Sequence, residues 1–338
     1  MPKCASTSVQ GHFFGGYAPY HQHGLLYPRT ACEMGGYRSH RPLLDAPTDQ
    51  MPALIDQIAQ EASQHSCDRI LISSEEFIHS RYDQEQPLTL IEFLNQRFGA
   101  QNVTLIYLLR DHVSFMESTY AQHIKGGMFR VRDNKLFAQH RFDLEGFADQ
   151  FKQTHGFEIF SYSDFFTRFE GRKAGNNIEY FSIHREDNAG KDIIETLCDF
   201  IGVSKIEESQ RKNSRMSEQA LFHILHARKR HGIRKVKPRR NILAKVFSDD
   251  EAFRSPLFRM TPALHQRIEA AAVTDRDFLA KHSPRKLDKM LQVSDRDFTV
   301  VDGPITPPDA VLELIDYIVT SDEMTVEKAR KAVPKYNE

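Results

Sequence analysis

Apolar residues along the chain gather in short segments that follow two alternating patterns. Uninterrupted apolar runs flanked by polar residues are typical of buried parallel strands, and they occur at residues 24–28, 69–73, 103–109, 157–163 and 178–184. Between them, apolar residues recur every three or four positions, which predicts helices over residues 51–64, 90–99, 112–125 and 192–203. Strands that alternate with helices predict an α/β fold with a mostly parallel sheet flanked by helices.

The pattern changes after residue 206. A helix is predicted over residues 219–231, and residues 228–240 hold eight Lys or Arg in thirteen positions. A break near Ser283 and Pro284 precedes two further predicted helices, at 307–319 and 325–333. We therefore expect an α/β domain over residues 1–282, which includes a basic segment at 206–250, and a helical C-terminal appendage over 283–338.

Composition narrows the class of protein. With 338 residues, 40% of them hydrophobic and 27% charged, the chain is typical of a globular protein with a full core. The net charge of -1 means that any basic surface is local. We expect no membrane span and no signal peptide, because the sequence has no apolar run of suitable length. Four widely spaced cysteines, Cys4, Cys32, Cys67 and Cys198, favour reduced thiols in the cytoplasm over disulfides or a metal site.

The first stretch that carries chemistry is PKCASTS, residues 2–8. If a strand precedes it and a helix begins near Ser6, the loop amides and the helix N-terminus converge on one anion. Lys3 adds a full positive charge, and Ser6, Thr7 and Ser8 add hydroxyl donors. The stretch therefore predicts a phosphate cradle, although it lacks the GxxxxGK[ST] pattern of a Walker A loop. The alternative is an ordinary Ser/Thr helix N-cap.

The second stretch, residues 106–120, has an Arg at the predicted end of a strand. Arg110 would lie at the carboxyl edge of the sheet, where ligands of parallel α/β proteins bind. Ser118 follows two helical turns later, so the two side chains together would hold one phosphate. The alternative is a surface Arg that pairs with Asp111 or Glu117, which would contribute little.

The third stretch is ILISSEE, residues 70–76. Glu75 follows a predicted buried strand, so its carboxylate would also lie at the carboxyl edge of the sheet. A carboxylate there, beside an acceptor hydroxyl, is suited to act as a general base. The alternative is a helix N-cap, because Ser73, Ser74 and Glu75 suit a helix start equally well.

The order and spacing of these three stretches resemble the sulfotransferase family, which uses 3′-phosphoadenosine 5′-phosphosulfate (PAPS) as the sulfuryl donor. The resemblance implies a P-loop-like fold and a donor site that comprises Lys3, Cys4, Ala5, Ser6, Thr7 and Ser8 for the 5′-phosphosulfate, Arg110 and Ser118 for the 3′-phosphate, and Lys212 from RKNSRMS. It also implies that Glu75 and Lys3 are the catalytic residues. ESTYAQHIKGG, CDFIGV and DRDFLAKH extend the similarity to bacterial carbohydrate-type members, and it spans residues 1 to about 282.

Two departures from the family pattern concern the start of the chain. Ala5 stands where the family has glycine, so the loop must accommodate a methyl group near the phosphosulfate. The strand that precedes the loop in the family has no counterpart in the sequence. We expect either that the natural chain begins upstream of Met1 or that the protein lacks its first strand, which would leave neighbouring strand edges exposed.

The resemblance implies sulfuryl transfer to a hydroxyl of a glycan or other carbohydrate-type acceptor. Glu75 would accept the hydroxyl proton, while Lys3 and the loop amides stabilise the leaving phosphate, and no metal is needed. His40, in GYRSHRPLL, is an alternative base or a substrate contact. Two other functions remain open: a non-catalytic binding protein of the same fold, and a P-loop nucleotide-dependent kinase.

The basic segment at residues 228–240 also has more than one interpretation. A solvated helix end and loop is the usual structure of such a charge run. A functional interpretation is attraction of an acidic acceptor or of the donor phosphates. We expect no specific nucleic-acid partner, because the net charge is near neutral and no aromatic stacking pattern accompanies the cations.

Overall fold

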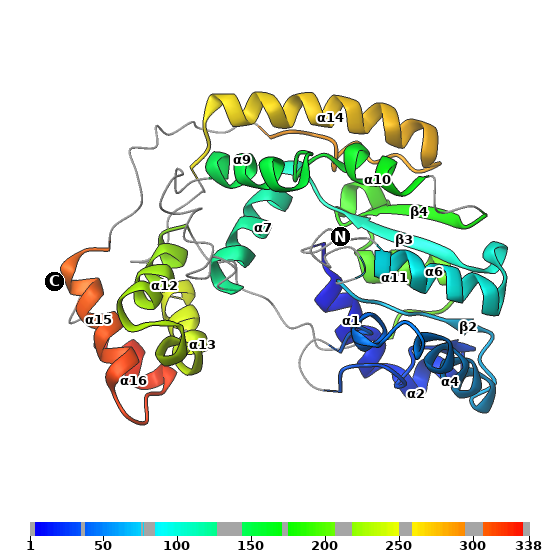
Figure 1. The fold of residues 1–338 in the computed structure, drawn as a ribbon, viewed down its shortest axis with the longest axis horizontal. Coiled ribbons are helices and arrows are strands. Elements are labelled where there is room, and N and C mark those ends of the chain that lie inside the picture. Colours follow the sequence, from blue (N-terminus) through cyan, green and yellow to red (C-terminus); the bar gives the residue numbers. More distant parts are fainter. Residues whose placement is uncertain are drawn as a thin grey trace. The chain divides into compact units, whose positions relative to one another are not determined.

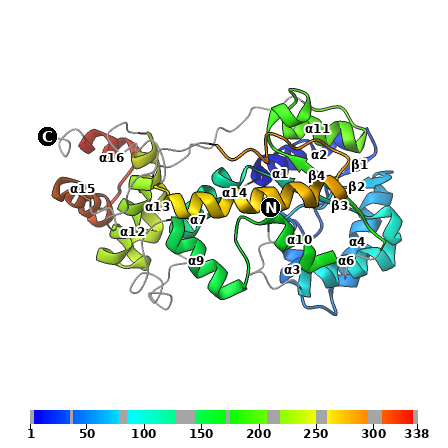
Figure 2. The ribbon, with the colours of Figure 1, turned by 90° about the horizontal axis from the view of Figure 1, so that it is seen from above.

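The computed structural model describes residues 4–34, 38–75, 77, 85–126, 144–170, 175–206, 218–249, 259–294 and 307–333. The chain divides into two compact units, each built from three stretches. Unit 1 comprises Met1–Phe115, Ser161–Arg211 and Ala270–Val293, and unit 2 comprises Met116–Phe160, Lys212–Glu269 and Ser294–Glu338. Two helices contribute residues to both units, α7 (His112–Gly126) and α14 (Pro262–His282), and Figure 2 shows α14 as one unbroken helix.

Unit 1 contains the strands, which pair in parallel as two separate two-stranded sheets (Figure 1). β1 (Leu25–Leu26) pairs with β2 (Arg69–Ile70), with Leu25 opposite Arg69. β3 (Thr104–Leu109) pairs with β4 (Asn177–Ser182), with Leu109 opposite Ser182. Four of the predicted strands are therefore confirmed, and the protein has a mixed α/β fold with small parallel sheets and many helices.

Most helices of unit 1 also follow the pattern of the sequence. They are α1 (Ser6–Gly15), α2 (Tyr17–His21), α3 (Pro42–Asp45), α4 (Met51–Gln64), α6 (Glu85–Phe98), α10 (Tyr162–Glu170) and α11 (Ile193–Ile201). Short 3-10 helices follow α6 (Ala100–Asn102) and β4 (Arg185–Asn188). The beginning of α1 at Ser6 confirms the predicted helix start, whereas α6 begins five residues before the predicted position of 90.

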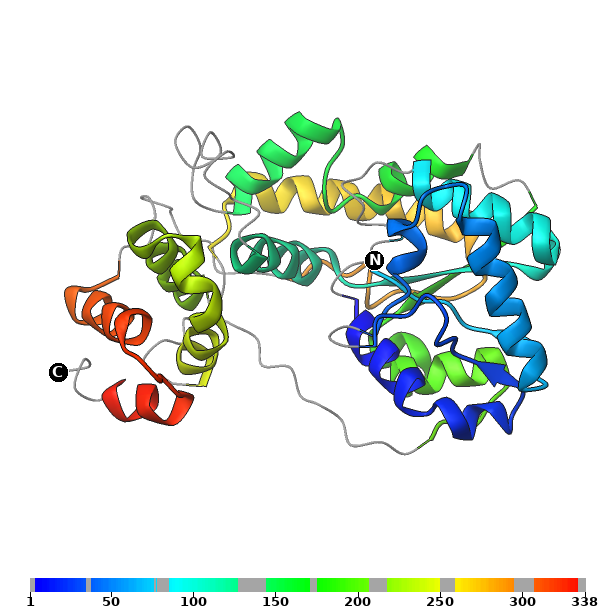
Figure 3. The same ribbon diagram turned by 60° about the horizontal axis from the view of Figure 1, so that its bottom comes forward.

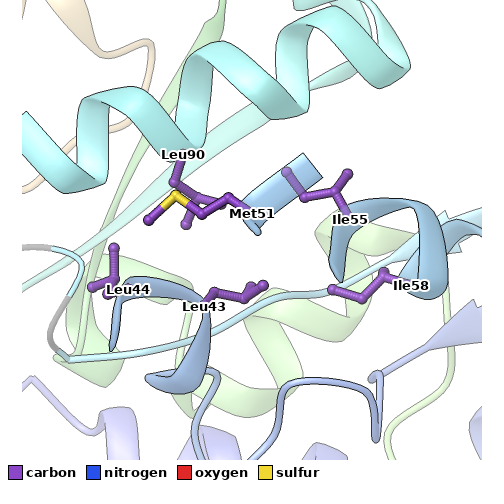
Figure 4. Close-up of a cluster of buried hydrophobic side chains, with 6 residues drawn as sticks. All are labelled: Leu43, Leu44, Met51, Ile55, Ile58 and Leu90. Atoms are coloured by element: carbon purple, nitrogen blue, oxygen red, sulfur yellow. The ribbon is translucent and has the colours of Figure 1, made fainter. Parts of the chain in front are cut away.

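One apolar cluster in unit 1 illustrates how the helical spacing packs the core (Figure 4). Its buried members come from three helices: Leu43 and Leu44 of α3, Met51, Ile55 and Ile58 of α4, and Leu90 of α6. The spacing of four and then three along α4 places its three side chains on one face. Each such buried side chain contributes on the order of 1.5–3 kcal/mol to the hydrophobic free energy of folding.

The strand predicted at residues 157–163 is wrong. These residues form a turn that leads into α10. Phe157, Ile159 and Phe160 are buried in this turn, so their apolar side chains belong to the core although the residues form no strand. The hydroxyl of Ser161 accepts a hydrogen bond from the amide of Asp164, 3.2 Å away, in the first turn of α10.

Unit 2 contains a group of helices formed by the basic segment and the C-terminal residues (Figure 3). α12 (Glu218–His231) and α13 (Ile233–Asp249) pack with α15 (Asp309–Thr320) and α16 (Val326–Ala332). The cations at 228–240 therefore lie on two consecutive helices. The usual structure of such a charge run, a solvated helix end and loop, is not what the segment forms. α9 (Leu144–His155) also belongs to this unit. In the described part of the chain, no helix is long and apolar enough to cross a bilayer.

Candidate functional site

The start of α1 has an unusual backbone. Ala5 has φ 62° and ψ 9°, in the left-handed region that favours glycine, and no side chain caps the helix. The amides of Ser8 and Val9 both donate to the Ala5 carbonyl at 3.0 Å. The amides of Ser6 and Thr7 have no acceptor within the described residues. The helix start therefore offers two amide donors and the positive end of the helix dipole, which is the chemistry that the sequence predicts for this loop.

A hydrogen bond joins this helix start to the residues that follow β2. Ser6 is 8% exposed, and its hydroxyl donates to the Glu75 carboxylate. One turn later, the side-chain amide of Gln10 donates to the Ser73 hydroxyl at 3.4 Å. The structure therefore brings together a residue of the expected donor loop and the expected general base.

Cys4 lies next to the same group of residues. Burial raises the pKa of its thiol to about 11, and the charges of Arg110, Glu75 and Asp111 also act on it. These groups follow β2 and β3, so the carboxyl ends of both strands lie close to the start of α1. The thiol itself is protonated at neutral pH, and any part of Cys4 in anion binding would be played by its backbone.

Arg110 directly follows β3 and is half-buried. Its main chain is held by Tyr162, whose hydroxyl donates to the Arg110 carbonyl at 2.5 Å and accepts from the Arg110 amide at 3.3 Å. Ser118 is half-buried on the part of α7 that belongs to unit 2. Joint binding of one phosphate by Arg110 and Ser118 therefore stays a prediction.

Asp111 and His184 form a pair beyond the ends of β3 and β4. An Asp111 carboxylate oxygen lies 3.1 Å from His184 Nε2, and the other accepts from the Ser114 amide at 2.8 Å, which caps α7. Burial would raise the pKa of Asp111, but the bonds from His184 and Ser114 outweigh it and lower the pKa to about 2. Asp111 therefore pairs with His184. The alternative that Arg110 pairs with Asp111 or Glu117 stays open.

Asp275 is a buried residue that sequence reasoning missed. Its carboxylate is fully buried and accepts from the amides of Tyr162 and Ser163 at 2.9 and 2.7 Å, and it lies 2.8 Å from His112 Nε2. It therefore caps α10 and fixes Tyr162, the residue that holds the main chain of Arg110. The signal was present, because Asp275 shares a helical face with Ala272, Phe278 and Leu279, all of which are buried.

His40 is fully buried, and both of its ring nitrogens contact the backbone. Nδ1 accepts from the Ser73 amide at 3.1 Å, and Nε2 donates to the Pro28 carbonyl at 3.0 Å, which a neutral imidazole satisfies. Burial lowers its pKa to about 4. This geometry favours a structural role for His40 over the base or substrate contact that the sequence suggested.

Two expected site residues, Lys3 and Lys212, lie outside the described residues. Within those residues, no group of three or more His, Cys, Asp or Glu could hold a metal ion. The four cysteines are free thiols.

A surface hollow of about 570 Å³ in unit 1 contains none of the expected site residues. It is lined by Glu186, Asp187, Arg276, Lys286, Asp288, Lys289 and Gln292. Asp187 is engaged by the amides of Lys289 and Met290, at 2.8 and 3.0 Å. Ligand sites are typically walled by apolar side chains, and this lining is charged, so we place the candidate site at the start of α1.

Comparisons of the chain with protein-family models, with curated proteins and with solved structures gave no match. The resemblance to sulfotransferases therefore rests on the motifs of the sequence alone.

Proposed function

We propose that the protein transfers a sulfuryl group from PAPS to a hydroxyl of a glycan or other carbohydrate-type acceptor. The observation that carries the proposal is the hydrogen bond between Ser6 and Glu75. It joins the helix start that would bind the donor to the carboxylate that would activate the acceptor. Because these groups come from distant parts of the sequence, their meeting supports a common site.

The donor would bind through its two anionic ends. The amides of Ser6 and Thr7 and the hydroxyls of the same loop suit the 5′-phosphosulfate. The guanidinium of Arg110 suits the 3′-phosphate, because it can form two charge-assisted hydrogen bonds. Lys3 would neutralise charge near the leaving group, and Lys212 is a further cation that the family resemblance assigns to the donor.

The transfer would be an in-line displacement at sulfur. The acceptor oxygen forms a bond to sulfur while the bond from sulfur to the donor phosphate oxygen breaks, and that oxygen keeps the electron pair. Glu75 takes the proton that the acceptor hydroxyl loses, and its carboxylate can do so while Ser6 stays hydrogen-bonded to it. The products are a sulfate ester and adenosine 3′,5′-bisphosphate, whose charge the loop stabilises.

Thermal stabilisation by adenosine 3′,5′-bisphosphate, compared with ATP, tests the donor site. We expect a clear rise in the melting temperature with the bisphosphate and a smaller rise with ATP, because only the former presents a 3′-phosphate. Turnover is then measured with radiolabelled PAPS and a panel of glycans.

Each other outcome identifies a different function. Equal shifts with both nucleotides would contradict a PAPS site, and a larger shift with ATP together with phosphoryl transfer would indicate a kinase. Binding of the bisphosphate without turnover of any acceptor would indicate a non-catalytic binding protein.

A further inference from the structure

The ladder of hydrogen bonds between β1 and β2 ends at the imidazole of His40. The Leu71 amide donates to the Leu26 carbonyl at 2.8 Å. In a parallel pair such bonds recur at every second residue, so the next one would run from the Ser73 amide to the Pro28 carbonyl. Instead, His40 Nδ1 accepts from the Ser73 amide at 3.1 Å, and Nε2 donates to the Pro28 carbonyl at 3.0 Å. The imidazole therefore takes the place of one ladder bond.

The backbone of His40 completes this replacement. Its amide donates to the Ser73 carbonyl at 2.8 Å, so the N–H and the C=O of Ser73 both bond to His40, as they would to a neighbouring strand. The ring is fully buried and packs edge-on against Tyr27, with the ring centroids 4.7 Å apart. Burial lowers the pKa of His40 to about 4, so the neutral ring offers one donor and one acceptor at neutral pH.

These bonds act on the segment that carries Glu75. Ser73 lies two residues before Glu75, whose carboxylate accepts from the Ser6 hydroxyl. The Ser73 hydroxyl accepts from the buried side-chain amide of Gln10, 3.4 Å away. Two elements therefore hold residues 73–75. His40 fixes the main chain of the segment, whereas Ser6 and Gln10 of α1 hold its side chains.

We propose that His40 is a positioning residue for Glu75. Its ring replaces a ladder bond and fixes the main chain at Ser73, and this sets where the Glu75 carboxylate meets the start of α1. His40 is 0% exposed, so it acts through Glu75 and touches neither donor nor acceptor. The effect on turnover rests on the proposed sulfuryl transfer, whereas the effect on the main chain is independent of it.

The tautomer of His40 tests this arrangement in the unmodified protein. Nitrogen NMR of the ring distinguishes a protonated nitrogen from an unprotonated one. We expect Nε2 to carry the proton at neutral pH and Nδ1 to carry none, because only this tautomer accepts from Ser73 and donates to Pro28. The opposite tautomer would overturn the proposal, since a protonated Nδ1 cannot accept from the Ser73 amide.

Two substitutions separate the bond to Ser73 from the bond to Pro28. His40→Asn places a carbonyl oxygen near the position of Nδ1, so it keeps an acceptor for the Ser73 amide. His40→Gln places an amide N–H near the position of Nε2, so it keeps only the donor to Pro28. We expect the Ser73 amide to exchange with solvent about tenfold faster in His40→Gln than in the parent, and to be little changed in His40→Asn. Equal exchange rates in the two variants would overturn the proposal.

Turnover of the same two variants separates positioning from general stabilisation. Each variant loses one hydrogen bond of His40, so a purely structural role would lower the activity of both alike. We expect the turnover number with PAPS to fall about 10²-fold in His40→Gln and no more than about threefold in His40→Asn, with the affinity for adenosine 3′,5′-bisphosphate unchanged in both. Equal losses of turnover would contradict positioning. If the parent protein turns over no acceptor, the proposed sulfuryl transfer fails, and exchange of the Ser73 amide still decides the role of His40.

Discussion

The hydroxyl of Ser6 donates a hydrogen bond to the carboxylate of Glu75, although 69 positions separate the two residues in sequence. The bond holds the first turn of α1 against the end of β2. In the proposed reaction, this carboxylate would accept the proton of the acceptor hydroxyl.

Replacement of Glu75 tests its role as the base. Glu75→Gln keeps the size of the side chain and its contact with Ser6 but removes the ability to accept a proton. We expect the turnover number to fall by about 10²–10⁴, while the affinity for adenosine 3′,5′-bisphosphate changes little. Glu92→Gln, on the exposed face of α6, is the matched control. Near-normal turnover of the Glu75 variant would remove this residue from the role.

Arg110 is expected to distinguish nucleotides with and without a 3′-phosphate. In Arg110→Ala, the dissociation constant for adenosine 3′,5′-bisphosphate should rise by roughly ten- to a hundredfold, because a charge-assisted bond is worth about 1.5–3 kcal/mol. Affinity for adenosine 5′-phosphate should hardly change. Isothermal titration gives both constants, and Arg97→Ala, which removes an exposed pair with Asp56, is the control. An equal loss for both nucleotides would contradict a specific 3′-phosphate contact.

The left-handed conformation of Ala5 predicts that glycine is better tolerated there. Ala5→Gly relieves the clash of the methyl group with the backbone, and we expect the free energy of unfolding to rise by about 0.5–1 kcal/mol. Ala53→Gly, at an exposed position inside α4, should have the opposite effect and lower it by about 1 kcal/mol. Urea denaturation measures both changes, and destabilisation by Ala5→Gly would contradict the conformation.

The buried carboxylate of Asp275 is expected to be a major contributor to stability. Asp275→Asn removes the charge that the amides of Tyr162 and Ser163 and the ring of His112 share, and it leaves a buried donor poorly paired. We expect a loss of about 3 kcal/mol in the free energy of unfolding. Asp277→Asn, on the exposed face of the same helix, should lie within about 0.5 kcal/mol of the parent. A neutral effect of Asp275→Asn would show that its three contacts do not stabilise the fold.

Burial of His40 predicts that the free energy of unfolding decreases as the pH falls. Its pKa is lowered by burial to about 4 in the folded protein, from 6.5 in the unfolded chain, so the unfolded state binds the proton more readily. Its contribution to stability is therefore complete above about pH 6.5 and is lost as the pH falls toward 4. His40→Gln should flatten the stability profile in this window, and His23→Gln, at an exposed position, should leave it unchanged. An unaltered profile in His40→Gln would contradict this role.

The pattern of apolar residues in the sequence predicted the elements whose apolar side chains are buried in the core. β3 and α4 were predicted within a residue or two, because β3 is a continuous apolar run and the apolar residues of α4 recur every three or four positions. The segment at 157–163 failed, since a short apolar run that includes aromatic residues serves a buried turn as well as a strand. α14 was not predicted, because the charged Asp275 stands among its buried apolar positions. α9 was also not predicted, although Leu144, Phe147 and Phe151 follow a helical spacing that indicates it.

The candidate site was predicted only where a residue directly follows a strand. Glu75 and Arg110 could be placed at the sheet edge, because the carboxyl ends of parallel strands lie together. The buried position of His40 could not be predicted, because its partners Pro28 and Ser73 are distant in the sequence. Asp275 was missed for the same reason, because its partners lie more than 100 positions away.

The division of the chain into stretches has a consequence for synthesis. Unit 1 is completed only when residues 270–293 leave the ribosome, and unit 2 only when residues 294–338 follow. Until Asp275 emerges, the first amides of α10 and the ring of His112 have not met their acceptor. Neither unit can therefore be completed until the last fifth of the chain is made. Chaperones would have a long interval in which to bind the incomplete units.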